Sequence, residues 1–282
     1  MILKMQINFD KKMIRIGKSE VQELHQWFSH YAEGFKHGKE DVRKNIILKE
    51  KHTENVCREI EFIGKELGLS DDELRLSDCM ALLHDVGRFE QYLRYETFSD
   101  PVSEDHAELG VKVIEDYGIL KRFSDSVKDL IIRAVRYHNR ASLPDDESET
   151  CLFFTKLLRD ADKLDIWRVV TEYYNRKDRK VNSTIQLNLP DTPGFSESVY
   201  NDVINKRVVN ADSMQNLNDF RLLQIGWVFD INFKPALQEV KARKYVEMIC
   251  DELPATDQVD RIIEVVQEHY LSAFNNHHRY SN

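Results

Sequence analysis

Helix-breaking residues are scarce along this 282-residue chain, and their scarcity constrains the fold more than any other feature of the sequence. Only 10 glycines and 6 prolines are present, so long segments run without interruption. Within these segments apolar residues recur at steps of three and four, the spacing that places them on one face of an α-helix. The sequence therefore predicts an all-α fold.

Helices are predicted wherever this spacing persists, and two of their boundaries carry clear signals. Gly68 follows the second helix in the position of a C-terminal glycine cap. Ser70 and Glu73 form the pattern of a capping box at the start of the third. The predicted helices span residues 18–34, 41–67, 70–87, 103–118, 124–138, 149–175, 197–207, 215–230 and 236–272.

Departures from the helical pattern are few. Residues 176–197 contain two prolines, a glycine and many polar side chains, which predicts a loop that could cover a site. Apolar and polar residues alternate briefly at Met5–Phe9 and Val181–Leu189, so a small hairpin is the most strand structure we expect. We therefore expect one helical domain over residues 1–282, with a core followed by a helical extension over about 197–272.

The composition favours a folded protein outside membranes. Apolar residues make up 41% of the chain, which is enough to fill a core. No stretch approaches roughly eighteen apolar residues, and the first residues lack the apolar run and cleavage site of a signal peptide. A cytoplasmic location is therefore expected. The cysteines form no CxxC pair and are expected to be buried, reduced thiols: Cys57, Cys79, Cys151 and Cys250.

The formal charge of −9, from 40 basic and 49 acidic side chains, constrains the partners. A net-acidic surface repels a phosphate polymer, so we expect no long nucleic acid as a partner. A small anionic substrate is compatible with this charge, because a bound metal ion inverts the local potential of a site. The sequence allows an oligomer and predicts no particular oligomeric state.

The residues able to carry chemistry are metal-binding side chains rather than the motifs of other enzyme classes. The sequence contains no GxGxxG, P-loop, GxSxG or HExxH motif. What remains is a set of histidines and aspartates spread over the predicted helices: His52, His84, Asp85, His106, His138 and Asp162.

The His84-Asp85 doublet is the most informative part of this set. Adjacent helical residues point about 100° apart, so both can reach one ion only at a helix end. Gly87 follows two residues later and is predicted to supply that end. The apolar run Met80–Leu83 precedes the doublet and predicts a buried helix, in which an ionised Asp85 would be costly without a cation.

His52 and Asp162 complete a mixed nitrogen and oxygen donor set. His52 lies in the middle of a helix whose apolar stripe includes Val56, and Asp162 lies one turn after Leu158, so both lean toward packed faces. Such a set suits manganese, iron, zinc, nickel or cobalt better than a thiolate-preferring ion. We therefore expect a divalent transition metal, bound as one or two ions.

The order of these residues resembles the HD superfamily of metal-dependent phosphohydrolases. The matching segments are Lys51–Thr53, Ala81–Gly87 and Asp160–Asp165, of which the last contains the ADxL pattern that selects Asp162. The resemblance implies an HD-domain helical bundle with a core over about 41–175 and a C-terminal helical extension. It also implies that the metal ligands are His52, His84, Asp85 and Asp162.

His106 and His138 match two further histidines that occur in HD branches holding two metals. His106 begins an HxxxG segment, and His138 ends a predicted helix as Arg-Tyr-His-Asn. For these branches the resemblance implies that both histidines are ligands and that Asp85 bridges the two ions. The alternative interpretation, in which these histidines are structural, stays open at this point.

The resemblance implies hydrolysis of a small phosphorylated substrate, such as a nucleotide, by a metal-activated water beside Asp85. Cationic side chains next to the ligands, Lys51, Arg88 and Lys163, are candidates for contacting its phosphate; with Asp85, Arg88 and Lys163 form the predicted catalytic set. Two other functions stay open. A di-iron oxygenase resembling myo-inositol oxygenase would use the same six ligands, and a non-catalytic regulatory protein would keep the metal for structure.

Overall fold

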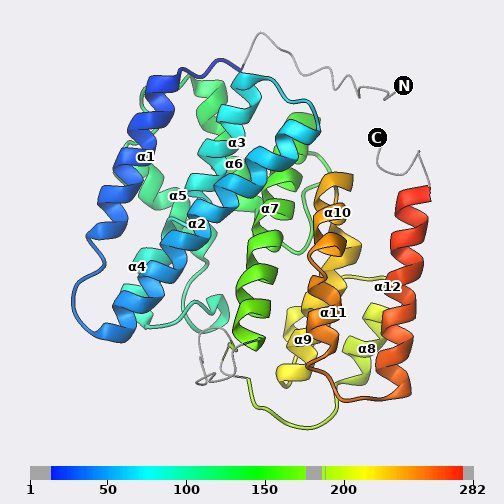
Figure 1. Ribbon diagram of the computed structural model, residues 1–282. Helices are drawn as coiled ribbons and strands as arrows, with labels where there is room; N and C mark the ends of the chain where they lie inside the picture. Colours follow the sequence, from blue (N-terminus) through cyan, green and yellow to red (C-terminus); the bar gives the residue numbers. More distant parts are fainter. Residues whose placement is uncertain (1–13, 176–185, 188, 276–282) are drawn as a thin grey trace. The chain divides into compact units, whose positions relative to one another are not determined.

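The computed structural model describes residues 14–175, 186–187 and 189–275, and every regular element within them is a helix (Figure 1). The predicted all-α class is therefore confirmed. Met5–Phe9, one half of the hairpin considered from the sequence, lies outside the described residues. Most of its other half, Val181–Leu189, does too, and the predicted loop at 176–197 is described only from residue 186 onward, without residue 188.

The chain divides into two compact units, Met1–Asp162 and Lys163–Asn282. Every helix predicted for the first unit is present, and α4 is an additional one. The elements of this unit are α1 (Lys18–Glu33), α2 (Glu40–Glu66), α3 (Asp71–Leu83), α4 (Gly87–Tyr95), the 3-10 turn η1 (Asp100–Val102), α5 (His106–Asp116), α6 (Asp125–Tyr137) and the first part of α7 (Glu149–Tyr174).

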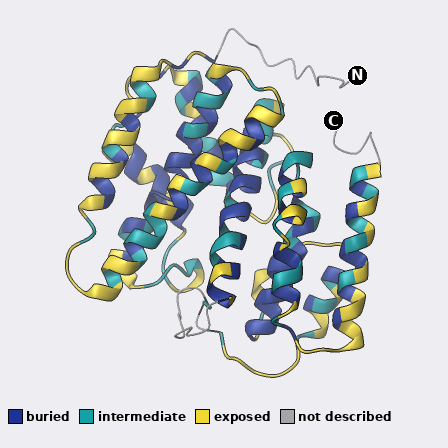
Figure 2. Ribbon diagram, viewed as in Figure 1, coloured by how far each residue is buried: buried dark blue, intermediate teal, exposed yellow. Residues whose placement is uncertain are grey.

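Helices α2 and α3 pack against each other along their apolar faces. The predicted capping box opens α3, where Ser70 Oγ accepts from the Glu73 N–H and Glu73 Oε2 accepts from the Ser70 N–H at 2.6 Å. The last turn of α3, Met80–Leu83, is at most 2% exposed (Figure 2). Because α3 ends inside the core, the residues that follow Leu83 are delivered to a buried position.

Two glycines near predicted helix ends have different roles. Gly68 follows α2 with a φ of +76°, the left-handed conformation predicted for a glycine cap. The prediction that Gly87 ends the preceding helix is wrong, since α3 ends at Leu83 and Gly87 is the first residue of α4. Gly87 instead permits a close approach of α4 and α5, because a Cβ added there would lie 2.3 Å from the His106 carbonyl oxygen.

The second unit differs from prediction at its C-terminal end. The predicted single helix over 236–272 is wrong, because Lys244 adopts a left-handed φ of +55° and Pro254 lacks the N–H that helical hydrogen bonding needs. The unit contains the end of α7, α8 (Glu197–Ile204), η2 (Ala211–Ser213), α9 (Leu217–Gly226), η3 (Trp227–Asp230), α10 (Lys234–Ala242), α11 (Tyr245–Cys250) and α12 (Asp257–Asn275).

Two expectations from the composition concern membranes and cysteines. Among the described residues, no helix is long and apolar enough to cross a membrane. All four cysteines are buried and free of disulfide bonds, as predicted. Burial raises the pKa of Cys151 to about 11 and that of Cys250 to about 12, which keeps both as neutral thiols.

The contact at Gly87 yields a test of how the helices are placed. A Cβ at Gly87 would meet backbone atoms of α5, at 2.3 Å from the His106 oxygen and 2.5 Å from the Gly110 nitrogen, and backbone cannot move aside easily. We expect Gly87→Ala to lower the free energy of unfolding by about 2 kcal/mol or more, measured by urea denaturation.

Gly110→Ala is the matched control, because a Cβ at that position would lie 3.4 Å or more from its neighbours. Alanine also favours the helix more than glycine does, so this variant should be within about 1 kcal/mol of wild type or more stable. Equal stability of the Gly87→Ala and wild-type proteins would contradict the close approach of α4 and α5.

Candidate metal centre

The six predicted ligands come from five helices or their ends and meet in the first unit. Three of them lie at helix ends: His84 caps the C-terminus of α3, His106 is the first residue of α5, and His138 caps the C-terminus of α6. Asp85 directly follows His84. The remaining two, His52 and Asp162, lie within α2 and α7.

One oxygen of Asp85 faces the first group of donors. Asp85 Oδ2 lies 3.5 Å from His52 Nε2 and 3.5 Å from His84 Nε2. These two imidazole nitrogens are 3.4 Å apart. Asp162 Oδ1 lies 3.0 Å from His52 Nε2 and 3.7 Å from His84 Nε2, so two carboxylates and two imidazoles converge on one point.

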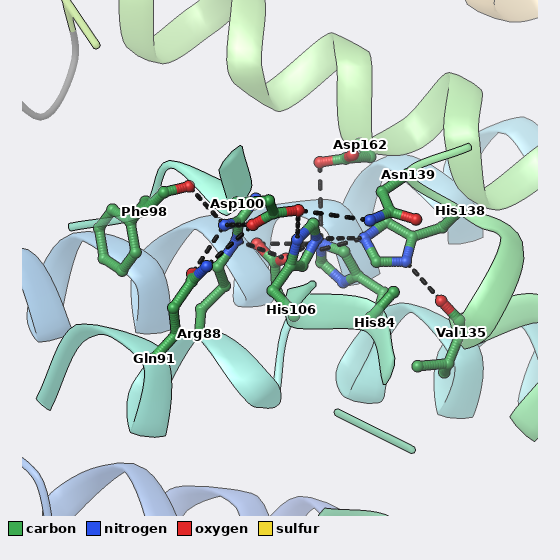
Figure 3. Close-up of polar contacts among 12 residues, drawn as sticks. His84, Arg88, Gln91, Phe98, Asp100, His106, Val135, His138, Asn139 and Asp162 are labelled. Atoms are coloured by element: carbon green, nitrogen blue, oxygen red, sulfur yellow. Dashed lines mark hydrogen bonds and ion pairs between the residues drawn. The ribbon is translucent and has the colours of Figure 1, made fainter. Parts of the chain in front are cut away.

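The other oxygen of Asp85 faces a second group. Asp85 Oδ1 lies 3.4 Å from His106 Nε2 and 3.8 Å from His138 Nε2. These two nitrogens are 3.0 Å apart, and Figure 3 shows the two histidine rings beside each other. The carboxylate of Asp85 therefore stands between two clusters of donor atoms, each compact enough to hold a metal ion.

Hydrogen bonds fix which nitrogen of each ring faces the centre. His84 Nδ1 lies 2.7 Å from the Ala81 carbonyl oxygen, and His138 Nδ1 lies 2.6 Å from that of Val135. A carbonyl oxygen only accepts, so Nδ1 must carry the proton in both rings. The Nε2 atoms that face Asp85 then present lone pairs when the rings are neutral, as metal-binding histidines do.

His106 follows the same rule with a carboxylate as its acceptor, because its Nδ1 lies 2.6 Å from Asp100 Oδ2. Its Nε2 therefore presents a lone pair toward the Nε2 of His138, only 3.0 Å away. Two lone pairs at that distance repel unless positive charge lies beside them. The donor set present in this structure thus fits a divalent transition metal.

Burial and charge set the protonation of the site. His106 is 3% exposed, and its burial, with the positive charge of Arg88, lowers its pKa to about 4. Burial also acts to raise the pKa of Asp85, but Lys49 and His84 outweigh it, and the net pKa lies well below the usual range. At Asp162 burial likewise acts to raise the pKa, but the imidazoles of His52 and His84 outweigh it, and the net pKa lies well below the usual range. Both carboxylates are therefore ionised at neutral pH.

Two charged residues at the centre were missed by the sequence analysis. Lys49 Nζ lies 2.6 Å from Asp85 Oδ2, and its spacing of three residues from His52 on α2 was the available signal. Asp100 binds His106 through one oxygen and Arg88 and Gln91 through the other, at 2.7 and 2.8 Å (Figure 3). Asp100 lies in a Ser-Asp-Pro segment that the sequence marks only as a turn.

The three cations proposed from the sequence lie in different surroundings. Arg88 Nη1 donates to Gln91, to the Phe98 carbonyl and to Asp100, and its Nε lies 3.5 Å from Asp85 Oδ1. Lys51 is exposed. Lys163 begins the second unit, where its ammonium donates to the carbonyl and the carboxylate of Asp230, at 3.1 and 2.6 Å. The predicted catalytic roles of Arg88 and Lys163 stay predictions.

Residues 50–167 match the family model of the HD domain, and this range contains all six predicted ligands. Residues 50–167 therefore carry an HD domain, the domain of a metal-dependent superfamily, and this match confirms the resemblance. HD domains bind divalent metals, and the two donor clusters around Asp85 are compatible with that property. No curated protein and no solved structure matches the chain.

Asp85 is the residue on which metal binding should depend most. Asp85→Ala removes the carboxylate shared by both donor clusters, so we expect the content of first-row transition metal to fall below about a tenth of the wild-type value. The measurement is elemental analysis of purified protein. Asp78→Ala removes the same charge from α3 at a side chain that is 25% exposed and paired with His25, and should keep its metal. Full metal retention by Asp85→Ala would refute the site.

Asp100 should strengthen metal binding through His106. Asp100→Asn removes the negative charge that holds the Nδ1 proton, so we expect metal affinity about tenfold to a hundredfold weaker by calorimetric titration. Asn139 donates to the same Asp100 oxygen at 3.4 Å, and Asn139→Ala should leave the affinity within about threefold. Equal losses in the two variants would show that the carboxylate charge is unimportant.

Proposed function

We propose that this protein is a metal-dependent phosphohydrolase that acts on a nucleotide or another small phosphoester. The observation that carries the proposal is the Asp85 carboxylate, whose two oxygens face two separate clusters of donors. A carboxylate shared in this way suits a pair of ions that act on one water and one phosphate. The HD family is commonly hydrolytic, which supports the same reaction class.

The residues that would hold the metal divide as their geometry does. His52, His84 and Asp162 surround one oxygen of Asp85, and His106 and His138 surround the other. A bound divalent metal would supply a water of lowered pKa and would neutralise charge on the phosphate oxygens. All other roles in the reaction belong to side chains of the chain itself.

Asp85 and Asp162 are the groups able to handle the proton of the attacking water. Both are ionised, so either can accept a hydrogen bond and orient the water toward phosphorus. Asp162 has 18% of its side chain exposed, compared with 4% for Asp85. We assign the orienting role to Asp85, which is held between the clusters, and acceptance of the proton to the more exposed carboxylate of Asp162.

A panel of nucleotides and small phosphoesters, assayed with manganese-loaded protein, tests the proposed hydrolysis. We expect phosphate release from at least one member of the panel and a loss of about a hundredfold or more in His84→Ala, since His84 contacts both carboxylates. Asp78→Ala should retain the activity, because Asp78 pairs with His25 on another face of α3.

Iron loading separates hydrolysis from the oxygenase alternative, because both functions use the same six side chains. The iron-loaded protein should consume no oxygen in the presence of myo-inositol or an organophosphonate. Oxygen uptake that depends on His84, with no phosphate released from any phosphoester under any metal, would replace the phosphohydrolase proposal with the oxygenase. Metal binding without either reaction would favour the regulatory alternative.

A further inference from the structure

Among the described residues, Lys49 is the only lysine whose ammonium contacts Asp85. Its Nζ lies 2.6 Å from Asp85 Oδ2, and this carboxylate is the only one with which it forms an ion pair in the described part of the chain. The Lys49 side chain is 18% exposed, whereas that of Asp85 is 4% exposed. The ammonium therefore neutralises a buried anion from the more accessible side of the site.

The oxygen that Lys49 contacts is also the oxygen that faces His52 and His84. Both of their Nε2 atoms lie 3.5 Å from Asp85 Oδ2. An ammonium and a divalent ion that contact the same oxygen repel each other strongly, because their positive charges lie a short distance apart. A metal ion in the first donor cluster would therefore weaken the contact between Lys49 and Asp85.

The side chain of Lys49 is freer to move than that of Arg88. Arg88 Nη1 is held by Gln91, Asp100 and the Phe98 carbonyl, so its guanidinium has a fixed place. Within the described residues, Lys49 has one ion-pair partner. It also has a flexible four-carbon stem and the ring of Phe98 at 5.3 Å as a second favourable neighbour. An ammonium whose contact with Asp85 is weakened would be available to an anion that binds beside the site.

We propose that Lys49 has two partners in turn. It neutralises Asp85 in the metal-free protein, and it binds a phosphate oxygen of the substrate once metal has taken its place on Asp85. The substrate half of this inference rests on the proposed phosphohydrolase function, and the metal half does not. Lys49 therefore competes with the metal and also contributes to binding of the anionic substrate.

The first arm of the test is calorimetric titration of metal-free protein with Mn²⁺. Lys49→Met removes the competing ammonium and should bind Mn²⁺ about tenfold more tightly than wild type. Lys44→Met is the matched control: it removes the same charge from α2, at a side chain that is 62% exposed and paired with Glu40. This control should bind Mn²⁺ as wild type does. Unchanged or weaker binding by Lys49→Met would overturn the competition.

The second arm measures binding of inorganic phosphate to the Mn²⁺-loaded proteins. We expect Lys49→Met to bind phosphate about tenfold more weakly than wild type, with Lys49→Arg keeping most of the affinity because its charge remains. Equal phosphate binding by Lys49→Met, Lys44→Met and wild type would overturn the substrate role.

Both arms measure binding and not catalysis. The inference about Lys49 and the proposed function can therefore be contradicted independently of each other. Suppose that wild-type protein hydrolyses no phosphoester but both binding changes occur. The phosphohydrolase proposal then fails, whereas the inference that Lys49 competes with the metal and binds phosphate holds. If wild type hydrolyses a substrate and Lys49→Met, folded by circular dichroism, shows neither binding change, the inference about Lys49 fails alone.

Discussion

The buried negative charge of Asp85 is the constraint on which the rest of the site depends. A carboxylate that is 3% exposed is unstable in a helical core unless positive charge or hydrogen-bond donors surround it. The fold brings such groups from several directions: Lys49 and His52 from α2, and histidines from the ends of α3, α5 and α6. Asp85 is therefore a buried anion that nearby positive charge stabilises, and the divalent metal that HD domains bind would supply such charge.

Helix ends solve a second problem at the same time. The last carbonyls of a helix lack partners within it, and histidines placed there can donate to them. His84 and His138 both use Nδ1 to bond the carbonyl three residues earlier, in the last turns of α3 and α6. This contact completes the helix, fixes the ring, and directs the Nε2 lone pair toward Asp85. Stability and metal binding therefore use the same hydrogen bonds.

The sequence allowed this cluster of six candidate ligands to be predicted because their chemistry is carried by residue type and order. Histidines and aspartates next to apolar runs are unusual enough to stand out, and the structure brings all six together. Lys49 and Asp100 could not be found in the same way, because lysine is common on helices and Asp100 sits in an ordinary turn. Their roles depend on where tertiary packing places α2 and η1. The helix break at Lys244 was missed for a related reason, since lysine carries no preference for a left-handed φ.

Anomalous X-ray diffraction at the manganese absorption edge, from crystals of the Mn²⁺-loaded protein, would show whether metal binds at Asp85. We expect anomalous density beside the Asp85 carboxylate, within bonding distance of His52 and His84, and a second peak between Asp85 and the pair His106 and His138. Density confined to other acidic side chains, with none next to Asp85, would contradict this expectation.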